Sequence, residues 1–291
     1  MTPFITLQSG PLRCELRPDL GGCVAGLWRG AQQVLRATAA AELQSVQRAA
    51  SYPLLPYSNR IGQRRLHWAG RDYLLAQNFA PEPHAIHGVG WERAWRVDQA
   101  SVTHAVLSYC HHADAAWPFA FDSQQTFSLS DDALELQMSI TNRAAEAAPV
   151  GLGWHPYFAK SAQTRIQFAA RGRWEMGGDK LPSERRAHPG LERDCTDLDI
   201  DHCFDGWSGS LLLTEGGLRL RLTSDLDCLV VFTTPARDSI AIEPVSHVNN
   251  ALALVRQRGH TPQALGLRVL QPGQAFSARM RIQIDPMEHH T

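Results

Sequence analysis

The chain has 291 residues, of which 44% are hydrophobic and 20% are charged. Its 28 lysine and arginine residues nearly balance 29 aspartate and glutamate residues, so charge gives no reason to expect nucleic acid or an anionic membrane as partner. No segment reaches the ~20 consecutive apolar residues of a membrane-spanning helix, and the N-terminal residues 1–7 lack the basic and apolar regions of a signal peptide.

The six cysteines are scattered along the chain, and none forms a C-x-x-C pair. A disulfide scaffold would be denser in cysteine, and a zinc ribbon requires paired spacing. We therefore expect reduced, mostly buried thiols in a cytoplasmic protein.

In chain order, the first predicted elements are a helix and a hairpin. Residues 38–50 form the only stretch with a plausible helical pattern, and that helix would be short. Residues 67–74, H-W-A-G-R-D-Y-L, predict two short strands joined by a turn, because Ala-Gly-Arg-Asp is rich in turn-forming residues.

The later part of the chain is dominated by alternation of apolar and polar residues. This pattern runs through residues 133–141, 218–222 and 276–284, whereas residues 211–214 and 228–234 are apolar on both faces and suit interior strands. Alternate side chains of a strand point to opposite faces. Residues 171–198 are rich in glycine, proline and charge, which favours long loops with short strands. The whole chain, 1–291, therefore predicts a single all-β domain built as a large antiparallel β-sandwich.

Histidine 155 is the first candidate for chemistry, within the aromatic sequence G-L-G-W-H-P-Y-F at residues 151–158. An imidazole exchanges protons near neutral pH, although a lone histidine in an apolar run is more often structural. Glu243 is the second candidate, because it follows the apolar residues 240–242 and precedes Pro244, which suggests the end of a strand. A buried carboxylate has a raised pKa and suits a general base, or it forms an ion pair, for example with Arg237 or Arg60.

Three further segments carry polar groups suited to a sugar. S-N-R-I-G contains Asn59 and Arg60, H-A-I-H-G-V-G-W contains His87, and I-D-H-C-F contains Asp201. A guanidinium presents several donors in one plane, and a carboxylate accepts from hydroxyl groups.

These three segments, taken with G-L-G-W-H-P-Y-F and A-I-E-P-V-S-H-V-N-N, resemble the ordered motif set of the aldose 1-epimerase (galactose mutarotase) family. The resemblance covers essentially the whole chain, and five motifs in order are far more specific than one. It implies the galactose mutarotase-like supersandwich fold with few short helices.

The resemblance also implies roles for individual residues. Glu243 corresponds to the general base and His155 to the general acid, while Arg60, Asn59, His87 and Asp201 correspond to substrate-binding residues. The implied reaction interconverts the α and β anomers of a free aldohexose by ring opening and reclosure. It needs no cofactor and no metal, because the carbonyl chemistry belongs to the sugar.

Two departures from the galactose-utilising members bear on the substrate. This chain has Pro156, Ala159 and Lys160 where many of those members read H-x-Y-F-N-L. It has Val230 where they carry a glutamine that contacts the sugar.

Three alternatives remain open. A mutarotase for a hexose 6-phosphate would need extra cations at the pocket, for which Arg64 and Arg65 are available. A non-catalytic carbohydrate-binding domain could share the fold. A metal hydrolase could use His84, His87 and His155, although no H-E-x-x-H helix is present.

Overall fold

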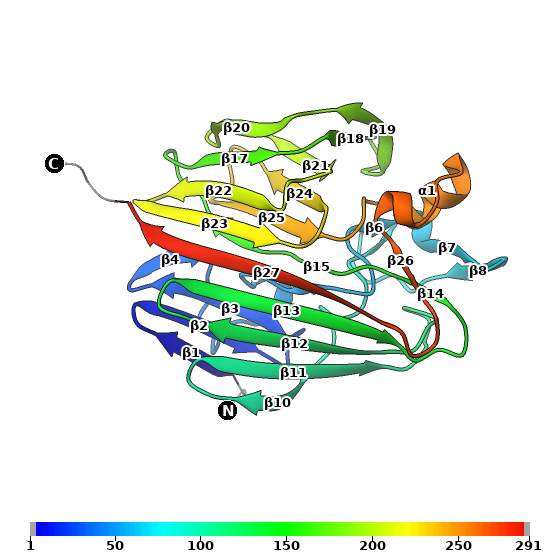
Figure 1. Cartoon of the computed structure of the whole chain (residues 1–291), viewed down its shortest axis with the longest axis horizontal. Coiled ribbons are helices and arrows are strands. Elements are labelled where there is room, and N and C mark those ends of the chain that lie inside the picture. The colour runs from blue at the N-terminus through cyan, green and yellow to red at the C-terminus, as the bar shows by residue number, and fades with distance from the viewer. Residues whose placement is uncertain (1–3, 288–291) are drawn as a thin grey trace.

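The computed structural model describes residues 4–287, so the C-terminal Glu288, His289 and His290 lie outside the described part of the chain. Within it, two large antiparallel sheets lie face to face, as Figure 1 shows. Their buried side chains belong to one continuous hydrophobic cluster. The predicted all-β sandwich is confirmed.

The first sheet has twelve strands and contains both the first strands of the chain and strands from its C-terminal half. Its main path, in spatial order, is β1 (Ile5–Ser9), β2 (Leu12–Arg17), β3 (Cys23–Arg29), β4 (Gln32–Leu35), β16 (Tyr157–Ala159), β25 (Ser239–Val245), β24 (Cys228–Thr233), β21 (Ile200–Asp205), β18 (Gly172–Met176) and β19 (Pro182–Ala187). Two short strands, β15 (Gly153–Trp154) and β5 (Pro53–Leu54), extend from β25 beside this path.

The second sheet has nine strands and faces the viewer in Figure 1. Its order is β10 (Arg96–Ala100), β11 (His104–His111), β12 (Phe121–Leu129), β13 (Ala133–Asn142), β27 (Ala275–Pro286), β23 (Leu218–Ser224), β22 (Ser210–Glu215), β17 (Arg165–Ala169) and β20 (Gly190–Asp194). Three two-stranded sheets complete the strands: β6 (Arg60–Ile61) with β9 (Ala85–Ile86), β7 (Arg65–Trp68) with β8 (Arg71–Leu74), and β14 (Ala148–Val150) with β26 (Arg268–Leu270).

The alternation of apolar and polar residues in the sequence corresponds to alternate burial of side chains in the strands. In β13 the even-numbered residues Leu134, Leu136, Met138 and Ile140 are buried, whereas Gln137 between them is exposed. β27 repeats the pattern and pairs antiparallel with β13. The predicted hairpin at residues 67–74 is also confirmed, as β7 and β8.

The helix predicted at residues 38–50 is wrong. Only a 3-10 turn, Val46–Arg48, forms there. Arginine side chains take the backbone carbonyls that a helix would use: Arg17 donates to Ala40 and Leu43, and Arg36 donates to Gln47 and Ala49. Tertiary hydrogen bonds thus override a weak local preference for helix.

The α-helix of the described chain is instead α1 (Ala251–Arg258), which the sequence analysis missed; two further 3-10 turns lie at Gly62–Arg64 and Gln263–Leu265. None of the helices between residues 4 and 287 has the length and apolar composition needed to cross a membrane. Residues 171–198 are more regular than expected, because β18 and β19 extend the first sheet and β20 extends the second.

All six cysteines are free thiols, as expected, and five of them are buried; Cys110 on β11 is exposed.

Candidate active site

The antiparallel register of three strands places His155 beside Glu243. β15 pairs Gly153 with Val245, and β16 pairs Tyr157 with Ala241, so residue 155 stands opposite residue 243. Residues opposite each other on antiparallel strands point to the same face of the sheet. Glu243 lies within β25 and not at its end, because the strand continues through Pro244 to Val245.

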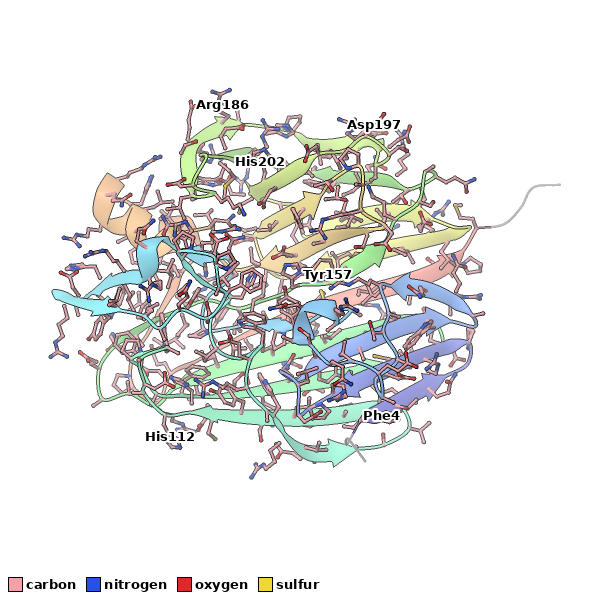
Figure 2. All side chains as sticks on the ribbon, turned by 180° about the vertical axis from the view of Figure 1, so that it is seen from behind. Phe4, His112, Tyr157, Arg186, Asp197 and His202 are labelled. Atoms are coloured by element: carbon pink, nitrogen blue, oxygen red, sulfur yellow. The ribbon has the colours of Figure 1, made fainter. Side chains whose placement is uncertain are left out.

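A second row of side chains lies on the same face of the sheet, two residues along each strand from His155 and Glu243. Tyr157 pairs with Ala241, Ala241 with Phe232, and Phe232 with Asp201. Ala241 is the small member of this row and is fully buried, whereas Tyr157, Phe232 and Asp201 line the pocket described below. Figure 2 shows Tyr157 near the middle of the molecule, viewed from the side opposite to Figure 1.

Residues 52–91 form the other wall of the site. β6 pairs Arg60 with Ile86 of β9, which brings Arg60 close to His87. Asn59 and His87 both adopt left-handed backbone conformations, with φ of 53° and 61°. Such values are uncommon outside glycine and cluster at functional sites.

These two walls enclose a pocket of about 350 Å³. All six residues selected from the sequence line it, namely Asn59, Arg60, His87, His155, Asp201 and Glu243. The site therefore combines the separate sequence motifs in one cavity.

The central feature of the pocket is a buried pair. His155 Nε2 lies 3.1 Å from Glu243 Oε1, and the side chains are only 6% and 3% exposed. The other polar atom of each group, His155 Nδ1 and Glu243 Oε2, has no hydrogen-bond partner among the described residues. A buried polar atom without a partner is costly, so both atoms are suited to bind ligand oxygens.

Burial shifts the two pKa values in opposite directions. Loss of water raises the pKa of Glu243 well above its usual 4.5, and the negative charge of Asp201 adds to that effect. Loss of water lowers the pKa of His155 well below its usual 6.5, and the nearby His87 and Arg36 add to it. Both shifts favour the uncharged forms of the pair, a carboxylic acid at Glu243 and a neutral imidazole at His155.

Aromatic rings fix the orientation of the catalytic candidate His155. The Tyr157 ring stacks on it with centroids 4.5 Å apart, and the Tyr52 ring covers it at 4.7 Å. Because these rings restrain the imidazole, its Nε2 stays directed at Glu243.

His87 is held as a neutral hydrogen-bond donor. Its Nδ1 accepts from the backbone N–H of Asn59 at 3.2 Å, which leaves the ring proton on Nε2. Burial, together with the charge of Arg60, lowers the pKa of His87 to about 3. The ring is therefore uncharged at neutral pH and can donate to a ligand oxygen.

Arg60 is fixed by two neighbours. Its Nε lies 3.4 Å from Glu82 Oε1, and its Nη1 donates to the Asn59 side chain at 3.4 Å. Glu82 also lies 3.7 Å from Lys180. The cation at this side of the pocket is thus held rigidly and partly neutralised.

Several residues of the pocket were not selected from the sequence. They are Arg36, Gln47, Tyr52, Phe79, Glu82, Ile86, Trp91, Tyr157, Lys180, Phe232 and Arg237. Tyr157 stood inside a quoted motif, and Trp91 carried the signal of a bulky aromatic near His87. Arg36 follows β4 without any local motif, so only the sheet topology brings it to the site.

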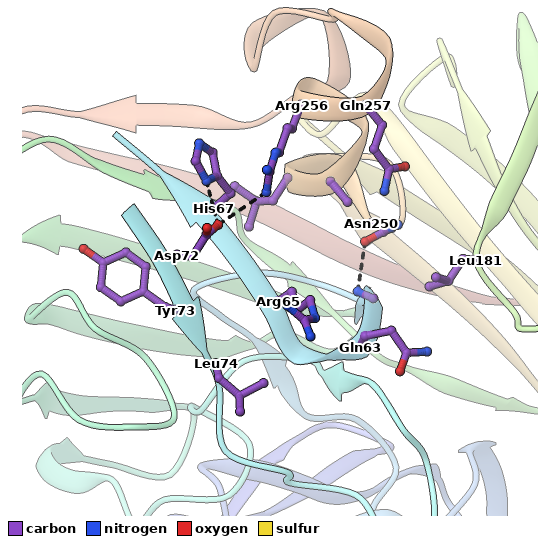
Figure 3. Close-up of a pocket in the computed structure, with 13 residues that line it drawn as sticks. Gln63, Arg65, His67, Asp72, Tyr73, Leu74, Leu181, Asn250, Arg256 and Gln257 are labelled. Carbon is purple, nitrogen blue, oxygen red and sulfur yellow. Dashed lines mark hydrogen bonds and ion pairs between the residues drawn. The ribbon is translucent and has the colours of Figure 1, made fainter. Parts of the chain in front are cut away.

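Arg64 and Arg65 do not line this pocket, so the prediction that they would hold a phosphate there is wrong. Arg65 lines a separate cavity of about 480 Å³ between the β7–β8 hairpin and α1, shown in Figure 3. There Asp72 contacts His67 and Arg256, and Asn250 accepts from the backbone of Gly62.

The geometry does not favour the metal-site alternative. His84 uses both ring nitrogens, since Nδ1 accepts from Gln63 N and Nε2 bonds to the carbonyl of Asp179. Between residues 4 and 287, no group of three His, Cys, Asp or Glu side chains is arranged to hold a metal ion.

Comparison with known proteins points to one family. The family model described as aldose 1-epimerase matches residues 3–283. The uncharacterized protein YphB of Escherichia coli K12 is 30% identical over 297 residues, which cover 96% of this chain and 98% of YphB. The uncharacterized protein YihR of the same organism is 25% identical over 68% of this chain and 70% of its own.

Solved structures agree. A crystal structure from Escherichia coli K12, provisionally assigned as an aldose 1-epimerase, has a TM-score of 0.88 and 28% identity, covering 98% of this chain and 99% of its own. A galactose mutarotase-like protein from Clostridium acetobutylicum shares the fold, with a TM-score of 0.84 and 18% identity over 98% of this chain and 95% of its own. The family match, which spans nearly the whole chain, establishes that this chain belongs to the aldose 1-epimerase family.

Proposed function

We propose that this chain is a mutarotase that interconverts the α and β anomers of an aldohexose, with Glu243 and His155 as its proton-transfer pair. The observation that carries the proposal is the buried 3.1 Å contact between His155 Nε2 and Glu243 Oε1 inside an open pocket. Membership of the aldose 1-epimerase family supports the reaction class.

The reaction needs a base at the C1 hydroxyl and an acid at the ring oxygen. The neutral pair reaches that state when the proton of Glu243 passes to His155, which yields a carboxylate and an imidazolium ion. Glu243 then removes the proton of the C1 hydroxyl while His155 protonates the ring oxygen, and the C1–O5 bond breaks. Rotation about C1–C2 and the reverse proton transfers close the ring on the other face.

The remaining polar residues would hold the sugar. His87, with its proton on Nε2, donates to an oxygen near the ring, and Asp201 accepts from ring hydroxyl groups. Arg60 is fixed by Glu82 and Asn59, so it donates in a set direction. Restrained groups orient a substrate at a lower entropy cost than mobile ones.

The substitution Glu243→Gln tests the proposal. It keeps the shape of the side chain and removes the base, so kcat for anomer exchange should fall by about 10² to 10⁴. Saturation-transfer NMR of a sugar anomer pair measures the exchange rate, and calorimetry measures sugar binding, which we expect to persist. Glu42→Gln, at an exposed position outside the pocket, is the matched control and should leave the rate unchanged.

The result also separates the enzyme from a carbohydrate-binding domain. If the wild-type chain binds sugars but does not accelerate their anomerisation, the proposal of catalysis fails and a binding function remains. If the wild-type chain is active and Glu243→Gln retains its rate, the assignment of the base is wrong.

A further inference from the structure

One end of the pocket carries two guanidinium groups that are not neutralised. Arg36 stacks on the Tyr157 ring, with Cζ 3.6 Å from the ring centroid. Its Nε and Nη2 donate to backbone carbonyls of Gln47 and Ala49, which leaves Nη1 without a protein acceptor among residues 4–287. No carboxylate of the described chain lies within 4.0 Å of it.

Arg237 reaches the same pocket from the turn between β24 and β25. Its Cζ lies 4.5 Å from the centroid of the Phe232 ring, and the residue is exposed. It too has no carboxylate within 4.0 Å in the described part of the protein. By contrast, the other cations of the pocket, Arg60 and Lys180, both contact Glu82.

Both stacked guanidinium groups line the pocket, together with the rings on which they stack. Tyr157 and Phe232 stand on either side of the small Ala241 in the same cross-strand row. Asp201 lies beyond Phe232 in that row, so Phe232 stands between Asp201 and the Tyr157 end of the row. A ligand group that lies in the pocket between the Tyr157 and Phe232 rings would have a cation on each side.

Guanidinium groups with free N–H donors bind carboxylate and phosphate oxygens by charge-assisted hydrogen bonds. Arg36 is held by ring stacking and by backbone carbonyls, so it loses little freedom on binding. An uncharged hydroxymethyl group would leave two unpaired cations around it. The chemistry of this end of the pocket therefore fits an anionic group.

We propose that the substrate is an aldose with an anionic substituent on C5, a carboxylate or a phosphate ester, held between Arg36 and Arg237. This inference rests on the proposed function, since His155 would protonate the ring oxygen, which is bonded to C5. Tyr157 follows His155 on the same face of the sheet and begins the row that carries both arginines. The C5 substituent is therefore the group best placed to reach them.

Paired sugars of similar shape test the charge requirement. Anomer exchange of glucuronate is compared with that of glucuronamide, which lacks the charge, and glucose 6-phosphate is compared with glucose. We expect kcat/KM to be about tenfold higher or more for the charged member of at least one pair. Preference within the first pair identifies a carboxylate, and preference within the second identifies a phosphate.

The variant Arg237→Gln tests whether Arg237 contributes to this preference. It should lower the ratio of kcat/KM for the charged sugar to that for its neutral partner about tenfold. Arg165→Gln, on the distant strand β17, removes a charge outside the pocket and should leave this ratio unchanged. Calorimetric binding of the same sugars provides a readout that does not depend on turnover, and it should show the same loss in Arg237→Gln.

The outcomes distinguish this inference from the proposed function. If neutral sugars are turned over as fast as charged ones, or if Arg237→Gln leaves the ratio unchanged, the anionic subsite is wrong while mutarotase activity stands. If no sugar is turned over but charged sugars bind preferentially and lose this preference in Arg237→Gln, the subsite stands and the catalytic proposal fails. If charged and neutral sugars bind alike, the subsite is overturned with or without activity.

Discussion

At the scale of single residues, Glu243 and His155 behave as one unit. Each would be costly to bury as an isolated charge, and the pKa shifts of both groups favour their uncharged forms. Val230 supports this environment, since it pairs with Glu243 in register and is buried. An apolar neighbour at that position contributes to the dehydration that raises the pKa of the carboxyl group.

The opposite pKa shifts of His155 and Glu243 predict how activity depends on pH. Lowering the pH adds a second proton at His155, whose pKa lies well below 6.5, and raising the pH removes the proton from Glu243, whose pKa lies well above 4.5. Activity should therefore fall at both extremes, with its acid limb below pH 6.5 and its alkaline limb above pH 4.5.

The measurement is kcat/KM for anomer exchange from about pH 4 to about pH 10, corrected for the uncatalysed rate in each buffer. An acid limb centred above pH 6.5 would contradict the conclusion that burial lowers the pKa of His155. A rate that rises steadily with pH would show that no acid is required.

At the scale of elements, one close backbone contact positions His87. Gly88 has a φ of 72°, and a Cβ atom there would lie 2.0 Å from the carbonyl oxygen of Leu55. That same carbonyl accepts from the backbone of Val89 and Gly90. The segment carrying His87 is therefore held against residue 55 by an arrangement that only glycine permits.

Substitution of this glycine should affect both stability and function. We expect Gly88→Ala to reduce the free energy of unfolding by about 2 to 4 kcal/mol, because the new methyl group displaces the backbone. It should also lower kcat/KM, since His87 moves with its neighbour. Urea unfolding and NMR exchange rates measure the two effects.

Gly70 provides the matched control. Its φ of 76° is similar, but nothing lies within 4 Å of the added Cβ atom. Gly70→Ala should cost only the left-handed backbone strain, about 1 kcal/mol, with no loss of activity. Equal effects of the two substitutions would contradict the role assigned to the contact with Leu55.

At the scale of the whole molecule, the last strand of the chain lies at the centre of a large sheet. β27 lies between β13 and β23 in the middle of the nine-stranded sheet. The first strands of the chain belong to the other sheet, and one hydrophobic cluster spans both. This arrangement supports the prediction that residues 1–291 form a single domain.

Loss of packing at this strand should therefore destabilise the entire molecule. Ile282 on β27 is fully buried, and Ile282→Ala should cost about 2 to 5 kcal/mol. Gln283→Ala, the adjacent position on the opposite face, should change stability by less than about 0.5 kcal/mol. Far-UV circular dichroism and tryptophan fluorescence should report one shared urea transition, and two separate transitions would contradict a single cooperative domain.

The sequence by itself determined the sandwich and the candidate site residues. Alternation with a period of two is a local property of strands, so β13 and β27 could be recognised without knowledge of their partners. The motifs around His155 and Glu243 likewise named residues that line one pocket. Their catalytic and binding roles remain predictions, for which Glu243→Gln is the first test.

Only the tertiary structure decided which segments meet. The register of β25 against β15 and β16 sets the His155–Glu243 contact, and the hydrogen bonds of Arg17 and Arg36 hold residues 38–50 out of a helix. Arg36 and Arg237 are about two hundred positions apart and carry no shared motif. Strand pairing over such separations depends on long-range contacts that no local pattern encodes. The positive charge at this end of the pocket could therefore be recognised only from the tertiary structure.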